Sequence, residues 1–397
     1  MNEADFLPYT IESLSNQSVQ HQILWVCVNQ PDHWWEDPDK VSICENNKRT
    51  LTYLSSLNMP GLVMIDKSSP GLGWSEKAFG VGQARKTIMD QINKHADPDD
   101  LLVSLDADTR IDRHYLEDVE KVFRKNPQAV ALSNPYYHEL TDDEQLDRAM
   151  LRYEIYMRHY AINMWRIGSP YSFTALGSAM ALPIRSYRKV GGMTPKKSGE
   201  DFYFLQKLRK AGWVCCDNQS RVYPATRYSD RVFFGTGPAL IKGSNGDWSS
   251  YPVYDHGLFD QIRQTYHLIP DLFKRDTETP LSPFLREQFG QEDPFAPLRQ
   301  NASSLKQFSR AFHEKLDGLR LLQYLKRANV SDTRSDEERL AAFLSAIYPG
   351  MLEKYFPGWD VNMLRSISFM ESPIVLLNKM RNLLMDVETT YQKMDKP

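Results

Sequence analysis

The sequence has little cysteine and no long apolar run. It contains four cysteines in 397 residues and no C-x-x-C pair, which argues against a disulfide framework or a cysteine-rich zinc site. No segment approaches the ~18 consecutive apolar residues of a membrane-spanning helix. The start, MNEADFLPYTIES, is acidic and polar where a secretory signal would be basic and then apolar. We therefore expect a cytoplasmic protein without a transmembrane segment, whose reduced core cysteines are Cys27, Cys44, Cys215 and Cys216.

The chain also lacks an excess of charge of one sign. Its 48 basic and 51 acidic residues give a formal net charge of −3, so no overall attraction to nucleic acid or to an anionic membrane is indicated. It shows no internal repeat and no low-complexity tract. A chain of 397 residues is too long for one ordinary core, so we expect a large domain and a smaller one.

The first two-thirds of the chain alternates short apolar runs with helical patterns. This alternation is typical of an α/β domain with a mostly parallel sheet, which we place at residues 1–268. One helix is expected over residues 76–95 with Ser75 as its N-cap, and another opens near Asp112. The expected strands cover residues 23–28, 62–65, 101–105, 129–132, 175–182 and 213–216.

From about Pro270 the pattern changes. Five prolines with little periodicity predict a linker or an ordered surface segment over residues 269–300. Residues 301–397 form a helical appendage, in which Ser335 and Glu338 match a capping box. An apolar stripe there most simply packs on a core, and contact with a membrane surface or a partner helix stays open; its members are Leu376, Met380, Leu383, Leu384 and Val387.

The stretch LLVSLDADTRID, residues 101–112, is the first candidate for chemistry. Asp106 and Asp108 follow a buried strand, and they could cap the next helix, but Asp112 is better placed for that role. The carboxyl ends of parallel strands are where open α/β sheets bind ligands. Paired carboxylates there suit Mg²⁺ or Mn²⁺ bound together with a substrate diphosphate.

The second candidate is GSAMALPIRSYRKVGGMTPKKSGEDFYFLQKL, residues 177–208. A run with small residues leads to a Gly-Gly turn and then to Glu200 and Asp201 at the start of an amphipathic helix. Ser198 and Asp201 also match a helix-capping pattern, and carboxylates are favoured in any first helical turn. This stretch by itself is therefore consistent with a capping role and with a catalytic role for Glu200 and Asp201.

The order of these elements resembles the family 2 glycosyltransferases, which have the GT-A fold, a Rossmann-like domain with a mostly parallel sheet. The chain shows, in sequence, VMID at 63–66, GVGQARK at 80–86, LDAD at 105–108, VGGM at 190–193 and GED at 199–201. The likeness covers residues 20–215, roughly half of the chain. The turn after the first strand, with Asn29, Gln30 and Pro31, matches the family pattern only loosely.

The resemblance implies a donor site built from these motifs. Asp66 would contact the nucleobase, with Asn29 nearby, and Arg85 would approach the phosphates or the ribose. Asp106 would lie near the ribose and the metal. Asp108 would be the main protein ligand of the divalent ion.

The resemblance also implies an acceptor site. Asp201 would be the general base of an inverting displacement, and Glu200 would bind the acceptor. The later segment 227–257 suits a closing loop in which Arg227 or Arg231 meets phosphate and Trp248 stacks on sugar, although a plain surface loop fits equally well. His256 could complete the metal site, as a late histidine does in some relatives, or be merely structural.

Three other functions agree less well with the sequence than glycosyl transfer does. An NAD-linked oxidoreductase needs the G-x-G-x-x-G fingerprint, which neither Gly71-x-Gly73 nor Gly80-x-Gly82 completes. A sugar-phosphate nucleotidyltransferase should carry a glycine-rich, basic loop after its first strand, where this chain reads VNQPDHWW. A non-catalytic nucleotide-sugar-binding homologue would be expected to have lost DAD or GED, and both are present.

The sequence thus predicts a cytoplasmic, metal-dependent glycosyltransferase that uses Mn²⁺ or Mg²⁺. The resemblance implies a nucleotide-diphosphate sugar as donor, with UDP-sugars favoured. It also implies a glycan, lipid-linked or surface-polymer acceptor, as in polysaccharide biosynthesis. No nucleic-acid partner is expected, and peripheral contact with a membrane stays open.

Overall fold

The computed structural model describes residues 1–76, 78–229 and 235–395 of an α/β protein. The chain forms two compact units. The first comprises Met1–Met150, Phe173–Gly246 and Gln392–Pro397, and the second comprises Leu151–Ser172 and Asp247–Tyr391. The long helix α5 (Glu144–Arg166) begins in the first unit and continues in the second. The boundary that we expected after residue 268 falls inside the second unit.

The first unit contains three groups of paired strands. A parallel pair joins β1 (Leu24–Asn29) to β2 (Leu62–Lys67), and an antiparallel pair joins β4 (Thr109–Ile111) to β8 (Val222–Pro224). A four-stranded sheet has the order β3-β6-β5-β7, with bounds Leu101–Ser104, Met180–Pro183, Ala131–Ser133 and Val214–Cys215. All of these strands except the short β4 and β8 overlap a predicted one.

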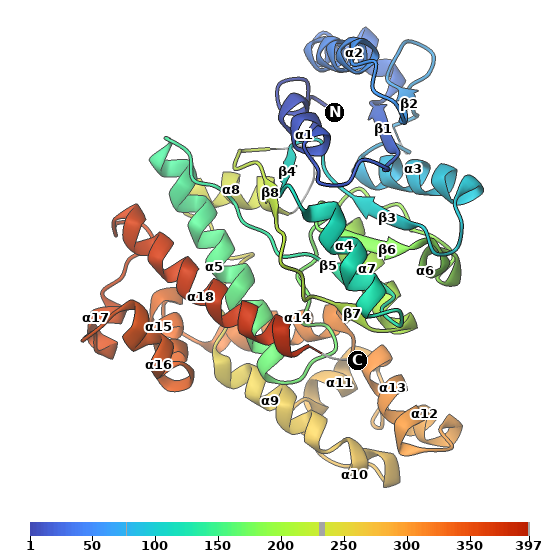
Figure 1. Cartoon of the computed structure of the whole chain (residues 1–397). Coiled ribbons are helices and arrows are strands. Elements are labelled where there is room, and N and C mark those ends of the chain that lie inside the picture. Colours follow the sequence, from blue (N-terminus) through green and yellow to red (C-terminus); the bar gives the residue numbers. More distant parts are fainter. Residues whose placement is uncertain (77, 230–234, 396–397) are drawn as a thin grey trace. The chain divides into compact units, whose positions relative to one another are not determined.

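The direction of the strands differs from the prediction of a mostly parallel sheet. In the four-stranded sheet, β6 runs antiparallel to both β3 and β5, and only β5 and β7 are parallel. Every residue of β6 is buried, and an apolar run of this kind indicates burial without indicating direction. Helix α6 (Ile184–Lys189) packs on β6, and α7 (Glu200–Ala211) packs on β5 and β7 (Figure 1).

Two helices of the first unit begin later than predicted. Helix α3 (Val81–His95) has Gly80 as its N-cap instead of Ser75, because Gly80 takes a positive φ of 114° that ends the preceding loop. Helix α4 (Tyr115–Lys125) has His114 as its N-cap. The remaining helices are α1 (Leu7–Ser15), η1 (Asp32–Glu36), α2 (Val41–Ser56) and α8 (Thr236–Ser244).

The second unit is helical, including the segment that the sequence suggested as a linker. Over residues 269–301 three short helices form, each with proline in its first turn, where the missing N–H would be unpaired in any case. These are α10 (Ile269–Lys274), α11 (Ser282–Phe289) and α12 (Ala296–Asn301). The other helices are α9 (His256–His267), α13 (Leu305–Lys315), α14 (Gly318–Ala328), η2 (Asn329–Ser331), α15 (Asp336–Ile347), α16 (Pro349–Tyr355), α17 (Val361–Arg365) and α18 (Ile374–Met394).

Helix α18 is bound to α5 by buried charges. Glu154 Oε1 accepts hydrogen bonds from Arg158 at 3.0 and 2.5 Å, and its Oε2 accepts one from Arg381 at 3.1 Å. Arg158 also pairs with Glu388, and all four side chains are at most 3% exposed. The predicted apolar stripe is buried here, with Met380, Leu383, Leu384 and Val387 at most 3% exposed. The predicted capping box of Ser335 and Glu338 is confirmed.

Replacing Glu154 with glutamine should lower the free energy of unfolding of the second unit. The change removes the carboxylate that both Arg158 and Arg381 bind, and breaking a buried ion pair costs about 3–5 kcal/mol. The control is Lys48→Met, which removes an exposed pair with Glu45 and should cost at most about 1 kcal/mol. Urea unfolding of both variants checks this, and equal midpoints would contradict it.

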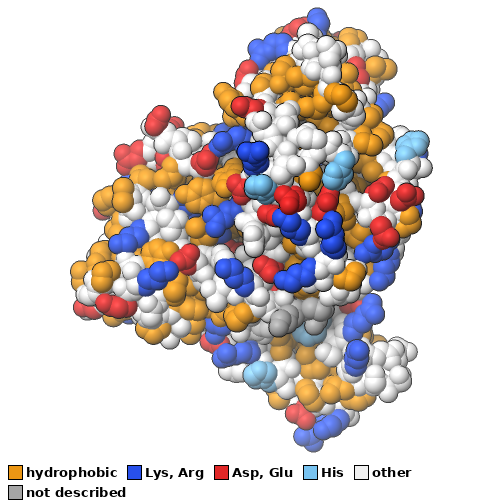
Figure 2. Space-filling view, viewed as in Figure 1, with side chains coloured by type: hydrophobic (Ala, Val, Ile, Leu, Met, Phe, Trp, Pro, Cys, Tyr) orange, Lys and Arg blue, Asp and Glu red, His pale blue; other side chains and the backbone are white. Residues whose placement is uncertain are grey.

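The surface carries charges of both signs. Figure 2 shows lysine, arginine and carboxylate side chains interspersed over the visible face, in agreement with the nearly balanced composition. None of the helices within the described ranges combines the length and the apolar character needed to traverse a lipid bilayer. All four cysteines are free thiols, and the prediction of a core position holds for Cys44, Cys215 and Cys216, whereas Cys27 is only partly buried.

Candidate functional site

The carboxyl ends of β1 and β2 bring two predicted site residues to one edge. The strands are parallel, with Val28 opposite Asp66 and Asn29 opposite Lys67. Asn29 is 5% exposed, and within the described part of the chain its Oδ1 atom has no hydrogen-bond partner. A buried amide oxygen without a partner carries a desolvation penalty, so this atom is suited to accept a hydrogen bond from a ligand.

Asp66 has a structural role as well. Its carboxylate accepts hydrogen bonds from the backbone N–H and hydroxyl groups of Ser68 and Ser69, at 2.5 to 3.0 Å. Burial would raise the pKa of Asp66, but these hydrogen bonds lower it below its usual value. Asp66 is therefore ionised at neutral pH and fixed in orientation at the end of β2.

The DAD turn, residues 106–108, follows β3 directly. Two other segments hold it, because Thr10 of α1 donates to Ala107 O at 2.9 Å and Ala225 N–H donates to Asp108 O at 3.1 Å. Within the turn itself, Thr109 N–H donates to Asp106 O. The Asp106 carboxylate is 39% exposed, while that of Asp108 is 14% exposed. Neither aspartate caps α4. Asp112 does not cap it either, because its carboxylate accepts from Arg221 N–H and the Tyr223 hydroxyl.

Arg85 links the DAD turn to α7. It lies in the second turn of α3, and its guanidinium group donates to Asp106 on one side and to Glu200 on the other. Burial alone would lower the pKa of Arg85, yet the charges of Asp106 and Glu200 raise it above its usual value. The structure thus shows this arginine bound to the two carboxylates, whereas its approach to a donor's phosphates or ribose stays a prediction.

Gly177 makes room for the Arg85 guanidinium group. The loop that carries Gly177 is tied to the end of β3 by the Ser104 hydroxyl, which donates to Gly177 O at 2.8 Å. A Cβ atom at Gly177 would lie 2.1 to 2.3 Å from the guanidinium atoms. Only glycine therefore allows the arginine to reach both carboxylates.

Replacing Gly177 with alanine should displace Arg85 and destabilise the first unit by about 1–3 kcal/mol, the usual range for overpacking. Thermal unfolding measures the loss. Gly350→Ala is the control, because a Cβ atom there meets nothing within 4 Å. If the Gly177→Ala protein were as stable as the parent, this would contradict the close approach of the Arg85 guanidinium group to residue 177.

Glu200 and Asp201 open α7. The N-cap is Gly199, which takes a left-handed φ of 66°, a conformation that glycine adopts without strain, and Ser198 directly precedes it. Glu200 is 3% exposed and faces Arg85, while Asp201 is partly exposed. Desolvation, aided by the charge of Glu200, raises the pKa of Asp201 to about 6. A carboxylate with such a pKa is a stronger base than an ordinary aspartate and is still mostly ionised at neutral pH.

Arg227 lies on the other side of the DAD turn. Its Nε and Nη2 atoms donate to Asp108 Oδ2 at 3.0 and 2.5 Å, and Nη2 also donates to both carboxylate oxygens of Glu3 at 2.7 Å. Burial and the charge of Asp106 raise the pKa of Asp108, although Arg227 opposes this. Glu3 was missed by the sequence analysis, because it lies 224 residues from Arg227 in a segment without a motif.

The donor set suits a divalent cation that is bound together with an anionic substrate. Five carboxylates lie around Arg85 and Arg227, namely Glu3, Asp106, Asp108, Glu200 and Asp201, so the described part of the site is rich in acidic groups. The described ranges contain no group of three or more histidine, cysteine or acidic side chains arranged as a complete metal site. Asp106 and Asp108 would therefore supply two hard oxygen ligands, which is typical of Mg²⁺ or Mn²⁺ sites completed by substrate phosphates.

The remaining predicted residues belong to other parts of the chain. Trp248 lies in the second unit, where the guanidinium group of Arg152 sits 5.1 Å from the centre of its ring. Arg231 lies outside the described residues. The proposed contacts of Trp248 with sugar and of Arg231 with phosphate stay predictions.

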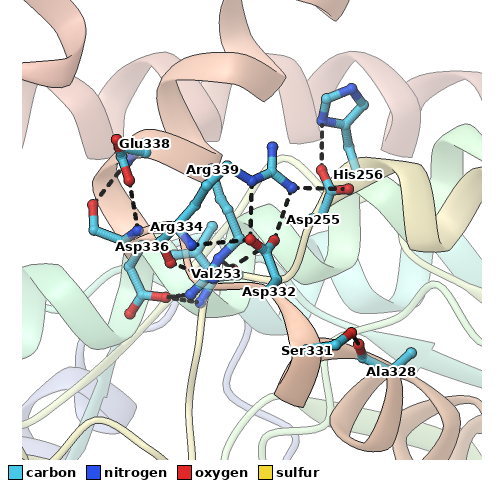
Figure 3. A network of polar contacts seen from close by, with 11 residues as sticks. Val253, Asp255, His256, Ala328, Ser331, Asp332, Arg334, Asp336, Glu338 and Arg339 are labelled. Carbon is cyan, nitrogen blue, oxygen red and sulfur yellow. Dashed lines mark hydrogen bonds and ion pairs between the residues drawn. The ribbon is translucent and has the colours of Figure 1, made fainter.

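His256 also lies in the second unit, at the start of α9, within a polar network that Figure 3 shows. Its Nδ1 atom is 3.4 Å from Asp255 Oδ1, and Asp255 in turn pairs with Arg334. Burial lowers the pKa of His256, so its ring is neutral at pH 7. A neutral imidazole is the form that binds metals, yet its neighbours here form a structural network, and its metal role stays a prediction.

The chain matches no protein-family model and no curated protein. Solved structures similar to it include S. aureus TarS 1–349, with 12% identity, a TM-score of 0.36, and coverage of 99% of this chain and 89% of that chain. Another is the mannosyltransferase PcManGT from Pyrobaculum calidifontis in complex with GDP-Man and Mn²⁺, with 14% identity, a TM-score of 0.35, and coverage of 100% and 85%. TM-scores this low do not establish a shared fold, so the function is argued from the residues of this chain.

Proposed function

We propose that the protein is a glycosyltransferase that moves a sugar from a nucleotide-diphosphate sugar to the hydroxyl group of an acceptor. One observation carries this proposal. Arg85 binds both Asp106 of the turn after β3 and Glu200 at the start of α7, so the residues proposed for cation binding and the residue proposed as general base lie in one unit. An inverting transfer from a diphosphate donor uses both a group that neutralises the leaving diphosphate and a base that deprotonates the acceptor.

The donor would lie along the carboxyl ends of β1, β2 and β3. The unpartnered Oδ1 atom of Asn29 and the fixed carboxylate of Asp66 can both accept hydrogen bonds from a nucleobase. Asp106 and Asp108 would hold Mn²⁺ or Mg²⁺ with the diphosphate. The bound cation would neutralise the charge that develops on the leaving diphosphate.

The acceptor hydroxyl would be deprotonated by Asp201. With its raised pKa, this carboxylate can take the proton at neutral pH while the acceptor oxygen attacks the anomeric carbon. A direct attack of this kind inverts the configuration at that carbon. Glu200 is held by Arg85 and would orient the acceptor or Asp201 beside it.

The assignment to a family 2 enzyme with a GT-A fold is supported by where the motifs lie. VMID lies on β2, GVGQARK opens α3, LDAD follows β3, and GED opens α7. Each therefore occupies a strand end or a helix start, where α/β proteins bind ligands. We further propose action in the cytoplasm on a glycan, lipid-linked or surface-polymer acceptor.

Incubation with a panel of UDP-, GDP-, CDP- and dTDP-sugars tests this function directly. Release of the nucleoside diphosphate in the presence of Mn²⁺ is the expected result, because glycosyl transfer to water or to an acceptor frees it. Asp108→Asn should abolish the release, and Asp142→Asn, an exposed aspartate of the same unit, should not. Release of nucleoside monophosphate and sugar phosphate would indicate different chemistry, and binding without any release would indicate a non-catalytic homologue.

A further inference from the structure

Arg227 is shared between Glu3 and Asp108, two carboxylates that are far apart in the sequence of the first unit. One face of its guanidinium group is covered by Phe6, whose ring centre is 4.2 Å away. Asp108 Oδ2 accepts from two of its nitrogens, and Glu3 accepts from Nη2 with both oxygens. The three charged side chains are 8 to 17% exposed, so they interact in a weakly screened environment.

Glu3 is held in place independently of Arg227. The backbone N–H group of Asn2 donates to Asn47 Oδ1, and that of Ala4 donates to Asn46 Oδ1, both at 3.0 Å. The residues on both sides of Glu3 are thus anchored to α2. Because Glu3 is fixed in this way, its carboxylate can still bind Arg227 when Asp108 no longer does.

A divalent cation cannot take Asp108 Oδ2 while two nitrogens of Arg227 donate to the same atom, because the two positive groups would repel each other at contact distance. Building on the proposed function, we infer that cation binding moves Arg227 from Asp108 to Glu3 alone. The Nε edge released by this move then donates to the diphosphate of the donor. Arg227 is thereby a donor-binding residue, and Glu3 is its positioning residue.

Mn²⁺ binding in the absence of nucleotide, followed by electron paramagnetic resonance, tests this exchange without any assay of activity. Arg227→Met removes the competitor and should tighten Mn²⁺ binding at least about tenfold, because the hydrogen bonds that Arg227 donates to Asp108 Oδ2 no longer have to be broken. Glu3→Gln removes the carboxylate to which Arg227 would move. Arg227 would then stay on Asp108, and Mn²⁺ binding should weaken. If Glu3, Asp108 and Arg227 served only to stabilise the fold, both variants would bind Mn²⁺ more weakly than the parent. That result would overturn the inference.

The double variant shows whether Glu3 acts through Arg227. In the Arg227→Met background, Glu3→Gln should change the Mn²⁺ affinity much less than it does in the parent. Matched controls are Arg110→Met, an exposed arginine paired with Glu139, and Asp5→Asn, an exposed aspartate of the same N-terminal segment that bonds Arg49. Both controls should bind Mn²⁺ as the parent does.

Nucleotide affinity separates this inference from the proposed function. With saturating Mn²⁺, Arg227→Met should bind the nucleoside diphosphate preferred by the parent about tenfold more weakly, because a charged hydrogen bond to phosphate is lost. Unchanged nucleotide affinity in this variant would refute the exchange and leave the glycosyltransferase proposal standing. If the parent binds no nucleoside diphosphate, the proposed function fails, and the inference that rests on it fails as well.

Discussion

Asp201→Asn should lower the rate of sugar transfer about 10²- to 10⁴-fold while nucleotide binding stays at the parent level. The amide has nearly the same shape as the carboxylate but cannot accept the proton of the acceptor hydroxyl. Asp201 opens α7, whereas the residues assigned to the donor lie at the ends of β1, β2 and β3. The loss should therefore appear in kcat and leave the Kd of the nucleoside diphosphate unchanged.

The pH dependence of the parent enzyme provides a second test of the same role. A base works only when it is deprotonated, and burial raises the pKa of Asp201 to about 6, so kcat should fall as the pH drops below about 6. If the base were an aspartate with an ordinary pKa, kcat would stay constant until the pH fell to about 4. Transfer by Asp201→Asn at the parent rate would show that another group is the base.

Arg85→Met should have the second large effect, on both stability and function. The change leaves the buried Glu200 carboxylate without its positive partner and frees Asp106, and an uncompensated buried charge of this kind costs about 3–5 kcal/mol. Arg85→Lys keeps the charge but has one point of contact where the guanidinium group has two, so it should recover only part of the stability. Urea unfolding compares the three proteins.

A double variant isolates the buried charge from other effects of the substitution. Adding Glu200→Gln to Arg85→Met removes the unpaired carboxylate, so the pair should lose much less stability than the two single changes added together. Additive losses would mean that Arg85 and Glu200 do not interact as the structure shows. Activity should remain low in the double variant, because Glu200, which would orient the acceptor or Asp201, is also replaced.

Much of the site could be predicted from local sequence patterns. The DAD turn follows a buried strand, and Glu200 and Asp201 open a helix, because apolar periodicity and glycine positions define those elements over short distances. The position of Arg85 in a helix was also predicted. Its simultaneous contact with Asp106 and Glu200 was not, because that contact spans 21 and 115 residues and depends on the missing side chain of Gly177.

Other features depend on long-range packing that no local pattern reports. Glu3 and Arg227 meet only through the fold, and the antiparallel direction of β6 cannot be deduced from its apolar residues. The prolines between 270 and 297 predict a linker or an ordered surface segment, and the structure has short helices there, because proline is also favoured in the first turn of a helix. Residues 151–172 belong to the same compact unit as residues 247–391, an association between distant parts of the sequence.

Thermal unfolding with nucleotides is the measurement that bears most directly on the proposed donor site. The protein would be heated with UDP, GDP, CDP or dTDP, each with and without Mn²⁺, beside the Asp108→Asn variant. Free nucleotide at about 100 times its Kd should stabilise the native state by about 2.7 kcal/mol, enough to raise the midpoint by several degrees. We expect one nucleotide to do so, only with Mn²⁺, and not in the variant. No shift with any nucleotide would contradict a nucleotide-sugar site at the DAD turn.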